Sequence, residues 1–250
     1  MTTDAVSGCV IVTGMPGAGK TTISSLAARL MPRAAHVDGD AVNLMIRSGF
    51  VWFSGKPTDD ALRHDELCNR NLCSLANNFI DFGFTVLLDT VLADRSELDF
   101  FLALMSPRPV RLIVLDPGVE VCKHRNAGRD PETQFEFHGY ERLEADMQRE
   151  FGDIGWWLDT SALDADQTAE MLVAGWEVAP RSCSRDGTPG SGGFTATAGD
   201  WSPRARVPPL ACKPSRVSRL APTGNQHVPP PQPPRWRNWC RPASPTSPLG

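Results

Sequence analysis

The sequence has no pattern of paired cysteines. Its seven cysteines are an odd number, are widely spread and include no C-x-x-C pair. They are Cys9, Cys68, Cys73, Cys122, Cys183, Cys212 and Cys240. Such spacing predicts neither a disulfide framework nor a zinc site. It favours a protein of a reducing compartment.

Long apolar runs are also absent. The amino-terminal stretch MTTDAVSGCVIVTG has no basic region, and its apolar run CVIV is too short for a secretory signal. No stretch approaches the roughly 20 apolar residues that cross a bilayer. We therefore expect a cytoplasmic protein with no membrane partner.

Charge and proline are distributed unevenly along the chain. Residues 1–180 carry 15 Lys and Arg against 27 Asp and Glu, whereas residues 181–250 carry 10 against 2. The second segment holds 14 of the 22 prolines, and only 7 of its 70 residues are Leu, Ile, Val or Phe. That is too little apolar side chain to offset the entropy of ordering the segment. We expect one domain over 1–180 and a disordered Pro/Arg-rich tail over 181–250.

Other interpretations of the tail stay open. Its positive balance could weakly attract nucleic acid, and Trp236 and Trp239, interleaved with Arg235 and Arg237, could stack on bases. We do not expect nucleic acid as a partner on this signal alone. Alternatively, the abrupt shift in composition could come from GC-rich DNA read in an altered frame. The sequence indicates no oligomeric state.

Five short apolar runs alternate with segments whose apolar residues have helical spacing. The continuous β-branched run CVIVT is typical of a strand buried on both faces of a parallel sheet. The five runs lie at 9–13, 34–38, 84–90, 109–116 and 156–161. The longest helical stripe covers 59–83 and has Gly83 as its stop. The alternation predicts an α/β domain with a five-stranded parallel sheet and helices on both faces.

Between the first strand and the first helix lies GMPGAGKT, which satisfies G-x-x-x-x-G-K-[ST] in full. Glycines let backbone N–H groups turn around phosphate oxygens, and the following helix directs its positive end at them. Lys20 would reach the β- and γ-phosphates, and the Thr21 hydroxyl would ligate Mg²⁺. The motif predicts a Walker A loop in a P-loop NTPase fold, with ATP and Mg²⁺ as cofactors. Its residues are Gly14, Met15, Pro16, Gly17, Ala18, Gly19, Lys20 and Thr21.

Acidic residues follow two of the expected strands. In HVDGDAV, Asp38 and Asp40 stand where ligands bind at the carboxyl edge of an open parallel sheet. Asp40 is the stronger candidate to accept the proton of an attacking hydroxyl, while one of the two could instead cap the next helix. Asp89 ends TVLLD and is a candidate Mg²⁺ ligand, or else a capping or solvated residue.

A pair of arginines suggests phosphoryl transfer. Arg125 and Arg129 lie four residues apart and therefore on one helix face. Arginines on a mobile lid can neutralise charge that develops on a transferring phosphoryl group, although surface ion pairs are an alternative. No T-K-x-D-like guanine motif follows, and we expect none of the extra domains of a mechanical ATPase. These absences weigh against a GTPase and a motor.

With these residues, the chain resembles the small P-loop kinases of the AAA_33 and chloramphenicol phosphotransferase-like group, and more distantly adenylylsulfate kinase and gluconate kinase. The resemblance covers roughly residues 8–178, through GMPGAGKTT, VDGD, TVLLDT, RNAGRD and WWLDTS in that order. It implies an ATP site over Gly14 to Thr22 and adenine near Ser161 to Leu163.

The resemblance also implies a hydroxyl-activating carboxylate at Asp40, an acidic residue of the third strand at Asp89, and lid arginines at Arg125 and Arg129. The chain departs from adenylylsulfate kinases in the residues after D-G-D, which are Ala41, Val42 and Asn43. It also has Thr90 where several relatives have a second acidic residue.

The segment between the second and third strands is the expected acceptor pocket. Trp52 and Phe53 could stack on a ring or pack in the core, and Arg63, His64 and Arg70 could read polar groups. His64 is better explained as a solvated helix residue than as a base.

Together these features predict an ATP- and Mg²⁺-dependent kinase that phosphorylates a hydroxyl of a small molecule. The alternatives are a nucleoside or nucleotide kinase and a regulatory protein that binds ATP without transferring phosphate.

Overall fold

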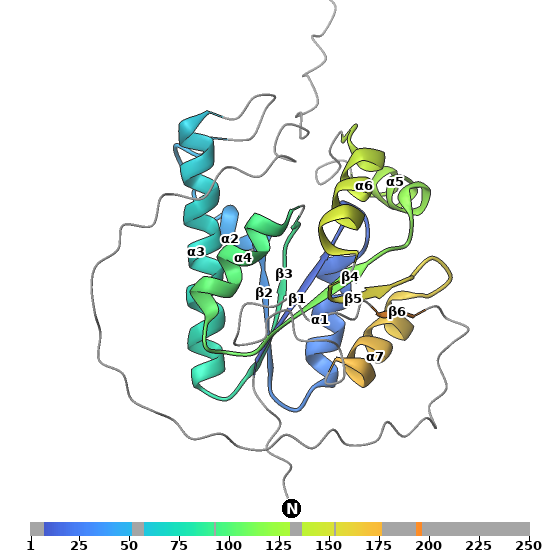
Figure 1. The fold of residues 1–250 in the computed structure, drawn as a ribbon, viewed down its shortest axis with the longest axis horizontal. Helices are drawn as coiled ribbons and strands as arrows, with labels where there is room; N and C mark the ends of the chain where they lie inside the picture. The colour runs from blue at the N-terminus through green and yellow to red at the C-terminus, as the bar shows by residue number, and fades with distance from the viewer. Residues whose placement is uncertain are drawn as a thin grey trace, which may run out of the picture.

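The computed structural model describes residues 8–51, 58–92, 94–130, 137–152, 154–176 and 194–196. One or two helices separate each strand from the next along the chain, and the strands form one parallel sheet (Figure 1). The strands are β1 Cys9–Gly14, β2 Ala34–Asp38, β3 Thr85–Asp89, β4 Val110–Leu115, β5 Trp156–Leu158 and β6 Phe194–Ala196. The helices are α1 Lys20–Leu30, α2 Gly39–Asn43, α3 Asp59–Asp81, α4 Arg95–Met105, α5 Val119–Ala127, α6 Tyr140–Phe151 and α7 Ala165–Gly175.

The sheet has the strand order β2-β3-β1-β4-β5-β6. The five-stranded parallel sheet that the sequence predicts is confirmed by the first five of these. Beyond them, β6 pairs in parallel with β5 and extends the sheet at its edge. The sequence predicted no strand after residue 180, because three residues are too few to show a period. The rest of the predicted tail lies outside the described residues.

Burial of β1 explains why its run is continuously apolar. The strand lies between β3 and β4, with Ile11 paired to Leu88 and to Leu112. Every residue of β1 is buried, as is every residue of β3 and β4. A strand covered on both faces has no polar face, so its side chains do not alternate. Helices α1 and α7 pack together on one side of the sheet, and α3 packs with α4 on the other (Figure 1).

Side-chain caps set several helix starts. The Thr58 hydroxyl accepts the N–H of Ala61 at the start of α3. In α7, Asp164 and Gln167 form a reciprocal capping box at the start of the helix. The predicted stop of α3 at Gly83 is confirmed, since Gly83 has a φ of 81° just beyond the helix.

The four cysteines in the described part of the chain are all buried and free. Burial raises the pKa of the Cys68 and Cys122 thiols to about 11, which keeps both protonated near neutral pH. No helix in the described ranges has the length and apolar character needed to traverse a bilayer.

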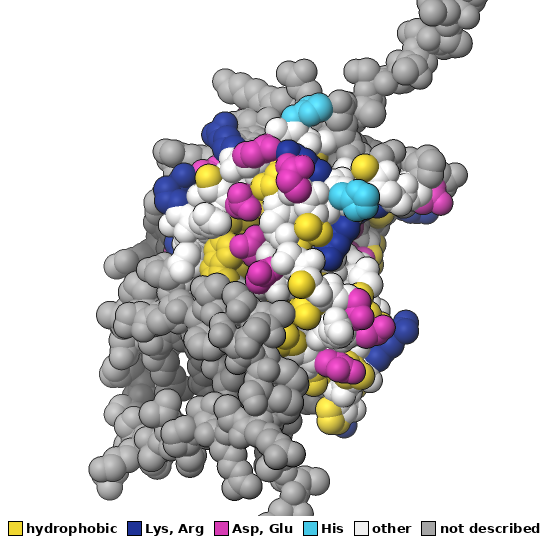
Figure 2. All heavy atoms as spheres, turned by 90° about the vertical axis from the view of Figure 1, so that its right-hand side faces the viewer, with side chains coloured by type: hydrophobic (Ala, Val, Ile, Leu, Met, Phe, Trp, Pro, Cys, Tyr) yellow, Lys and Arg dark blue, Asp and Glu magenta, His cyan; other side chains and the backbone are white. Residues whose placement is uncertain are grey.

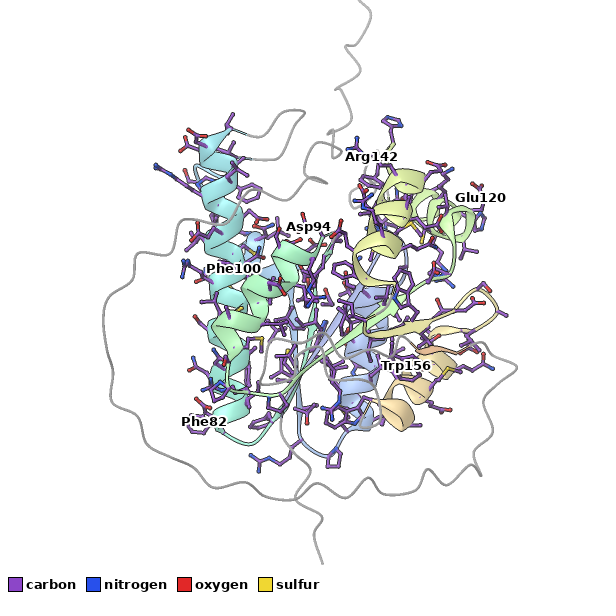
Figure 3. The ribbon with its side chains drawn as sticks, in the orientation of Figure 1. Phe82, Asp94, Phe100, Glu120, Arg142 and Trp156 are labelled. Atoms are coloured by element: carbon purple, nitrogen blue, oxygen red, sulfur yellow. The ribbon has the colours of Figure 1, made fainter. Side chains whose placement is uncertain are left out.

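The contact between α7 and β5 makes a testable prediction for stability. Gly175 lies against the ring of Trp156, which points from β5 toward α7 (Figure 3), and a Cβ there would overlap that ring. Because the ring is buried, Gly175→Ala should lower the free energy of unfolding by about 1–3 kcal/mol. Urea unfolding measures it. The neighbouring exposed change Ala174→Ser should stay within about 0.5 kcal/mol of wild type. Equal stability of Gly175→Ala and Ala174→Ser would contradict this packing.

Candidate active site

The loop between β1 and α1 turns through three glycines with positive φ. Gly14, Gly17 and Gly19 have φ of 151°, 86° and 97°. A Cβ on Gly14 would lie 2.6 Å from the carbonyl oxygen of Leu115, and one on Gly17 would overlap the carbonyl oxygen of Cys122. The loop is therefore wedged against the end of β4 and against α5, and only residues without a Cβ allow it. This geometry is that of the predicted phosphate cradle.

Lys20 is the first residue of α1 and bends back over the loop. Its ammonium donates hydrogen bonds to the carbonyl oxygens of Gly14 at 3.0 Å and of Met15 at 3.2 Å. Burial lowers the pKa of Lys20, while the carboxylates of Asp89 and Asp40 act in the opposite direction. The cation is thus held at the mouth of the loop, within electrostatic range of both predicted acidic residues.

Asp89 ends β3 and is almost fully buried. Its Oδ1 accepts a hydrogen bond of 3.5 Å from the Thr21 hydroxyl, in the first turn of α1. Its Oδ2 lies 2.6 Å from Nε2 of His36 in β2. The carboxylate therefore joins the phosphate loop to the edge strand.

Asp38 caps α2, and Asp40 does not. Oδ1 of Asp38 accepts the backbone N–H groups of Asp40 at 2.9 Å and of Ala41 at 3.2 Å. The capping role that the sequence left open between the two residues thus falls to Asp38. Asp40 lies in the first turn of α2 with its carboxylate exposed.

Asp40 also lies within electrostatic range of the other site residues. Although its side chain touches solvent, the surrounding protein removes part of its hydration and raises the pKa of its carboxyl. The charges of Asp38 and Asp89 add to this rise in pKa, whereas Lys20 and Arg129 oppose it. Five of the residues singled out in the sequence therefore interact electrostatically at one edge of the sheet.

Close packing at position 39 explains why the VDGD segment has a glycine there. A Cβ there would lie 2.9 Å from the carbonyl oxygen of Asp89 and 3.3 Å from Oγ1 of Thr90. The turn from β2 into α2 thus packs directly on the end of β3. Thr90, which replaces the second acidic residue of several relatives, is fixed there by a backbone hydrogen bond of 3.2 Å to Val12.

The predicted placement of the two arginines on one helix face is wrong, because α5 ends at Ala127 and Arg129 lies beyond it. Nη1 of Arg125 donates to the carbonyl oxygen of Ala18 at 3.4 Å, so the Arg125 side chain reaches from α5 and contacts the loop. Arg129 lies just after α5, is exposed, and interacts electrostatically with Lys20 and Asp40. The structure brings both residues to the cradle. Residues 131–136, where a lid would continue, lie outside the described residues.

Lys123 forms ion pairs within α5 and between α5 and α6. Its ammonium pairs with Glu120 at 3.0 Å and, across the helices, with Glu141 at 2.5 Å. Glu120 is labelled on the outer side of α5 in Figure 3. Acidic and basic side chains are interspersed on the described part of the face that Figure 2 shows. Exposed pairs of this kind stabilise only weakly, so they orient the helices more than they stabilise the fold.

Three of the residues predicted for the acceptor pocket, Arg63, His64 and Arg70, are described, and all lie on α3. Trp52 and Phe53 lie outside the described residues. Arg63 is exposed on α3. Arg70 pairs with Glu66 at 2.8 Å, and its guanidinium lies 5.6 Å from the centre of the Phe100 ring on α4 (Figure 3). Arg70 therefore contributes to the contact between α3 and α4.

His64 has a structural contact that sequence reasoning missed. Its Nδ1 accepts the backbone N–H of Val51 at 3.2 Å, and its ring stacks on Phe50 at 6.0 Å between centroids. Nδ1 is therefore an acceptor and carries no hydrogen. The side chain fixes residues 50 and 51 to α3 rather than projecting freely into solvent.

The expected adenine region follows β5. The backbone N–H of Ser161 donates to Asp159 at 2.9 Å, and that of Leu163 donates to the carbonyl of Thr160 at 3.4 Å. Thr160 is buried, and within the described residues its Oγ1 has no hydrogen-bond partner. Sequence reasoning missed both Thr160 and His36. Their place at or near the carboxyl ends of two strands is a signal that could have found them.

The donor atoms fit a magnesium nucleotide. Thr21 and Asp89 offer a hydroxyl and a carboxylate oxygen, which are the hard ligands that Mg²⁺ binds. No group of three or more His, Cys, Asp and Glu able to hold a metal occurs in the described part of the chain. Mg²⁺ typically uses one or two protein ligands together with substrate phosphates, so a sparse donor set agrees with it.

The parallel sheet, the strand–loop–helix cradle and its lysine define a P-loop NTPase fold. The chain belongs to the AAA_33 family, whose profile, described as an AAA domain, matches residues 9–152. A search of curated proteins found no match.

Several solved structures are similar to this chain. An unliganded sugar kinase from Janibacter sp. HTCC2649 is 20% identical with a TM-score of 0.50, over 69% of this chain and 95% of that one. The tunicamycin resistance protein of Deinococcus radiodurans is 14% identical with a TM-score of 0.53, over 69% and 95%. The APS kinase CysC of Mycobacterium tuberculosis is 16% identical with a TM-score of 0.48, over 68% and 98%.

The cradle makes a prediction that separates backbone strain from steric overlap. Gly17→Ala places a Cβ against the carbonyl of Cys122, so the loop must shift, and we expect ATP affinity to fall at least about tenfold. Gly83→Ala is the matched control, because Gly83 has nearly the same φ of 81° but its Cβ would meet nothing closer than 3.9 Å.

Both variants should lose about 1–2 kcal/mol of stability to the positive φ. Fluorescent ATP-analogue titration and urea unfolding measure the two effects. A Gly17→Ala protein that binds the nucleotide as well as Gly83→Ala does would contradict a tightly packed cradle.

Proposed function

We propose that the protein is an ATP- and Mg²⁺-dependent kinase that transfers the γ-phosphoryl group to a hydroxyl of a small molecule. The observation that carries this proposal is the meeting of a phosphate cradle and a separate carboxylate, Asp40, at one edge of the sheet. A protein that only binds nucleotide needs the cradle but has no use for such a carboxylate. Membership of the AAA_33 family and a fold shared with a sugar kinase support the proposal.

The cradle would bind the triphosphate. Backbone N–H groups of the loop and the positive end of α1 attract phosphate oxygens, and Lys20 adds a full positive charge beside them. Thr21 and Asp89 would hold Mg²⁺, which supplies neutralisation of phosphate charge when it is bound.

Asp40 would accept the proton of the acceptor. The acceptor oxygen attacks the γ-phosphorus, the bond to the β–γ bridging oxygen breaks, and the hydroxyl proton passes to the Asp40 carboxylate. Asp38 is less suited to this role, because it caps α2 through two backbone N–H groups. Asp40 has no such bond to α2 and lies exposed within range of Lys20.

The arginines would act on the charge that develops during transfer. Arg125 contacts the loop through Ala18, so it would support the cradle and the phosphates that the cradle holds. Arg129 is exposed at the mouth and close enough to Asp40 and Lys20 to affect their pKa values. A guanidinium there would stabilise negative charge on the transferring group.

The first test of the proposed function separates binding from transfer. Asp40→Asn should keep ATP affinity within about twofold and lower phosphoryl transfer by about 10²–10⁴-fold, the usual contribution of a positioned base. Lys20→Ala should lose both. Asp166→Asn is the matched control, because Asp166 also lies exposed in the first turn of a helix, α7, without capping it. Full transfer by Asp40→Asn would refute the role of Asp40.

The acceptor panel decides between the alternatives. Consumption of γ-³²P-labelled ATP is measured with sugars and other hydroxyl metabolites, and with nucleosides and nucleotides. Transfer to the first group supports the proposed function, and transfer to the second identifies a nucleoside or nucleotide kinase. Tight ATP binding with no transfer to any acceptor identifies a regulatory protein.

A second test uses pH. Asp40 accepts a proton only when it is ionised, so transfer should fall as pH drops through its pKa. Because that pKa is raised, the fall should begin at a higher pH than for a fully solvated aspartate. Asp38→Ser keeps a capping oxygen but removes a charge that raises the pKa of Asp40. The acidic limb of kcat/KM should therefore move to lower pH in Asp38→Ser. An unchanged acidic limb, with transfer still active, would contradict the assignment to Asp40.

A further inference from the structure

We propose that His36 is a positioning residue for magnesium, holding Asp89 so that its Oδ1 faces Thr21. The inference rests on the proposed function only in taking Asp89 and Thr21 as the metal-holding pair. The observation behind it is the division of one buried carboxylate between two elements, with Oδ1 toward α1 and Oδ2 toward β2.

The strand register brings His36 to Asp89. In the parallel pair of β2 and β3, Asp38 stands opposite Asp89 and His36 stands opposite Leu87. Side chains two residues apart on a strand share a face, so His36 and Asp89 project from the same face of the sheet. The imidazole of His36 then reaches diagonally across to the carboxylate. The pairing thus depends on the fold and on no local motif.

The two contacts of Asp89 differ in strength. The distance from Nε2 of His36 to Oδ2 is 2.6 Å, which is short for an N–H···O bond and typical of one with an ionised partner. The distance from the Thr21 hydroxyl to Oδ1 is 3.5 Å, at the outer limit of hydrogen bonding. His36 therefore fixes the carboxylate plane far more firmly than Thr21 does.

Burial of both side chains makes the hydrogen bond between His36 and Asp89 hard to replace. The side chain of Asp89 is 4% exposed and that of His36 is 17% exposed, so water has little access to replace a lost donor. An ionised carboxylate only accepts hydrogen bonds, so Nε2 carries the hydrogen of this bond. Without the His36 donor, the Asp89 carboxylate would rotate toward other hydrogen-bond partners. Its Oδ1 would then no longer be held beside Thr21.

The test measures metal binding rather than transfer. Mn²⁺, a paramagnetic substitute for Mg²⁺, is titrated by electron paramagnetic resonance into the full chain with a non-hydrolysable ATP analogue. His36→Leu should weaken Mn²⁺ binding about 10–100-fold, the usual effect of removing a group that orients a metal ligand. Affinity for the analogue without metal should stay unchanged, because the cradle does not contact His36 in the described hydrogen bonds. His36→Gln, which keeps an N–H donor, should restore part of the metal affinity.

The controls separate this inference from the proposed function. His124→Leu removes an exposed histidine on α5 and should bind Mn²⁺ like wild type. Equal Mn²⁺ binding by His36→Leu and wild type would overturn the positioning role alone. A wild-type protein that binds neither the analogue nor Mn²⁺ would overturn the proposed function and this inference together.

A second measurement needs no variant that could misfold. Two-bond ¹H–¹⁵N correlations of wild type report which ring nitrogen carries the hydrogen. We expect the Nε2–H tautomer at His36, and an Nδ1–H tautomer there would overturn the inference.

Discussion

The site depends on one steric constraint, which is the packing of a glycine loop against two carbonyl oxygens. Gly14 lies on Leu115 of β4, and Gly17 lies on Cys122 of α5. Because neither position has space for a Cβ, the loop is fixed to both elements at once. The start of α1 and the Lys20 ammonium are thereby set at the carboxyl edge of the sheet. Arg125, which donates to Ala18 of the same loop, is set there by the same packing.

Strand order then decides which side chains meet the loop. Since β1 lies between β3 and β4, the residue that ends β3 stands directly beside the cradle. That residue is Asp89, which explains how a carboxylate 68 positions away in sequence reaches Thr21. The next strand outward, β2, supplies Asp38 and leads into Asp40. In phosphoryl transfer the protein mainly positions groups and stabilises charge, so this arrangement of rigid strand ends is most of what such an enzyme needs.

Much of this edge could be predicted from the sequence because its signals are local. The cradle follows from eight consecutive residues, and the buried strands from uninterrupted apolar runs. Asp38 and Asp40 could be placed at a strand end, but only the backbone geometry shows which of them caps α2. His36 and Asp89 meet through the register of two strands, which a single sequence does not encode in any short pattern. The contact of Arg70 with Phe100 is likewise absent from any short pattern, since it depends on how α3 packs on α4.

Asp89 shows how burial and function constrain one another. A carboxylate at the end of a central strand is costly to bury unless hydrogen-bond donors surround it. His36 meets that need from the edge strand β2, and the hydroxyl of Thr21 adds a weak second contact. The weak contact, from the Thr21 hydroxyl to Oδ1, lies on the side of the cradle. Oδ1 is therefore held less tightly by hydrogen bonding than Oδ2. A buried acid that is held firmly by one oxygen can offer the other to a cation without moving. The same bond that offsets the cost of burying Asp89 therefore also holds its Oδ1 toward Thr21, as the proposed metal-holding role requires.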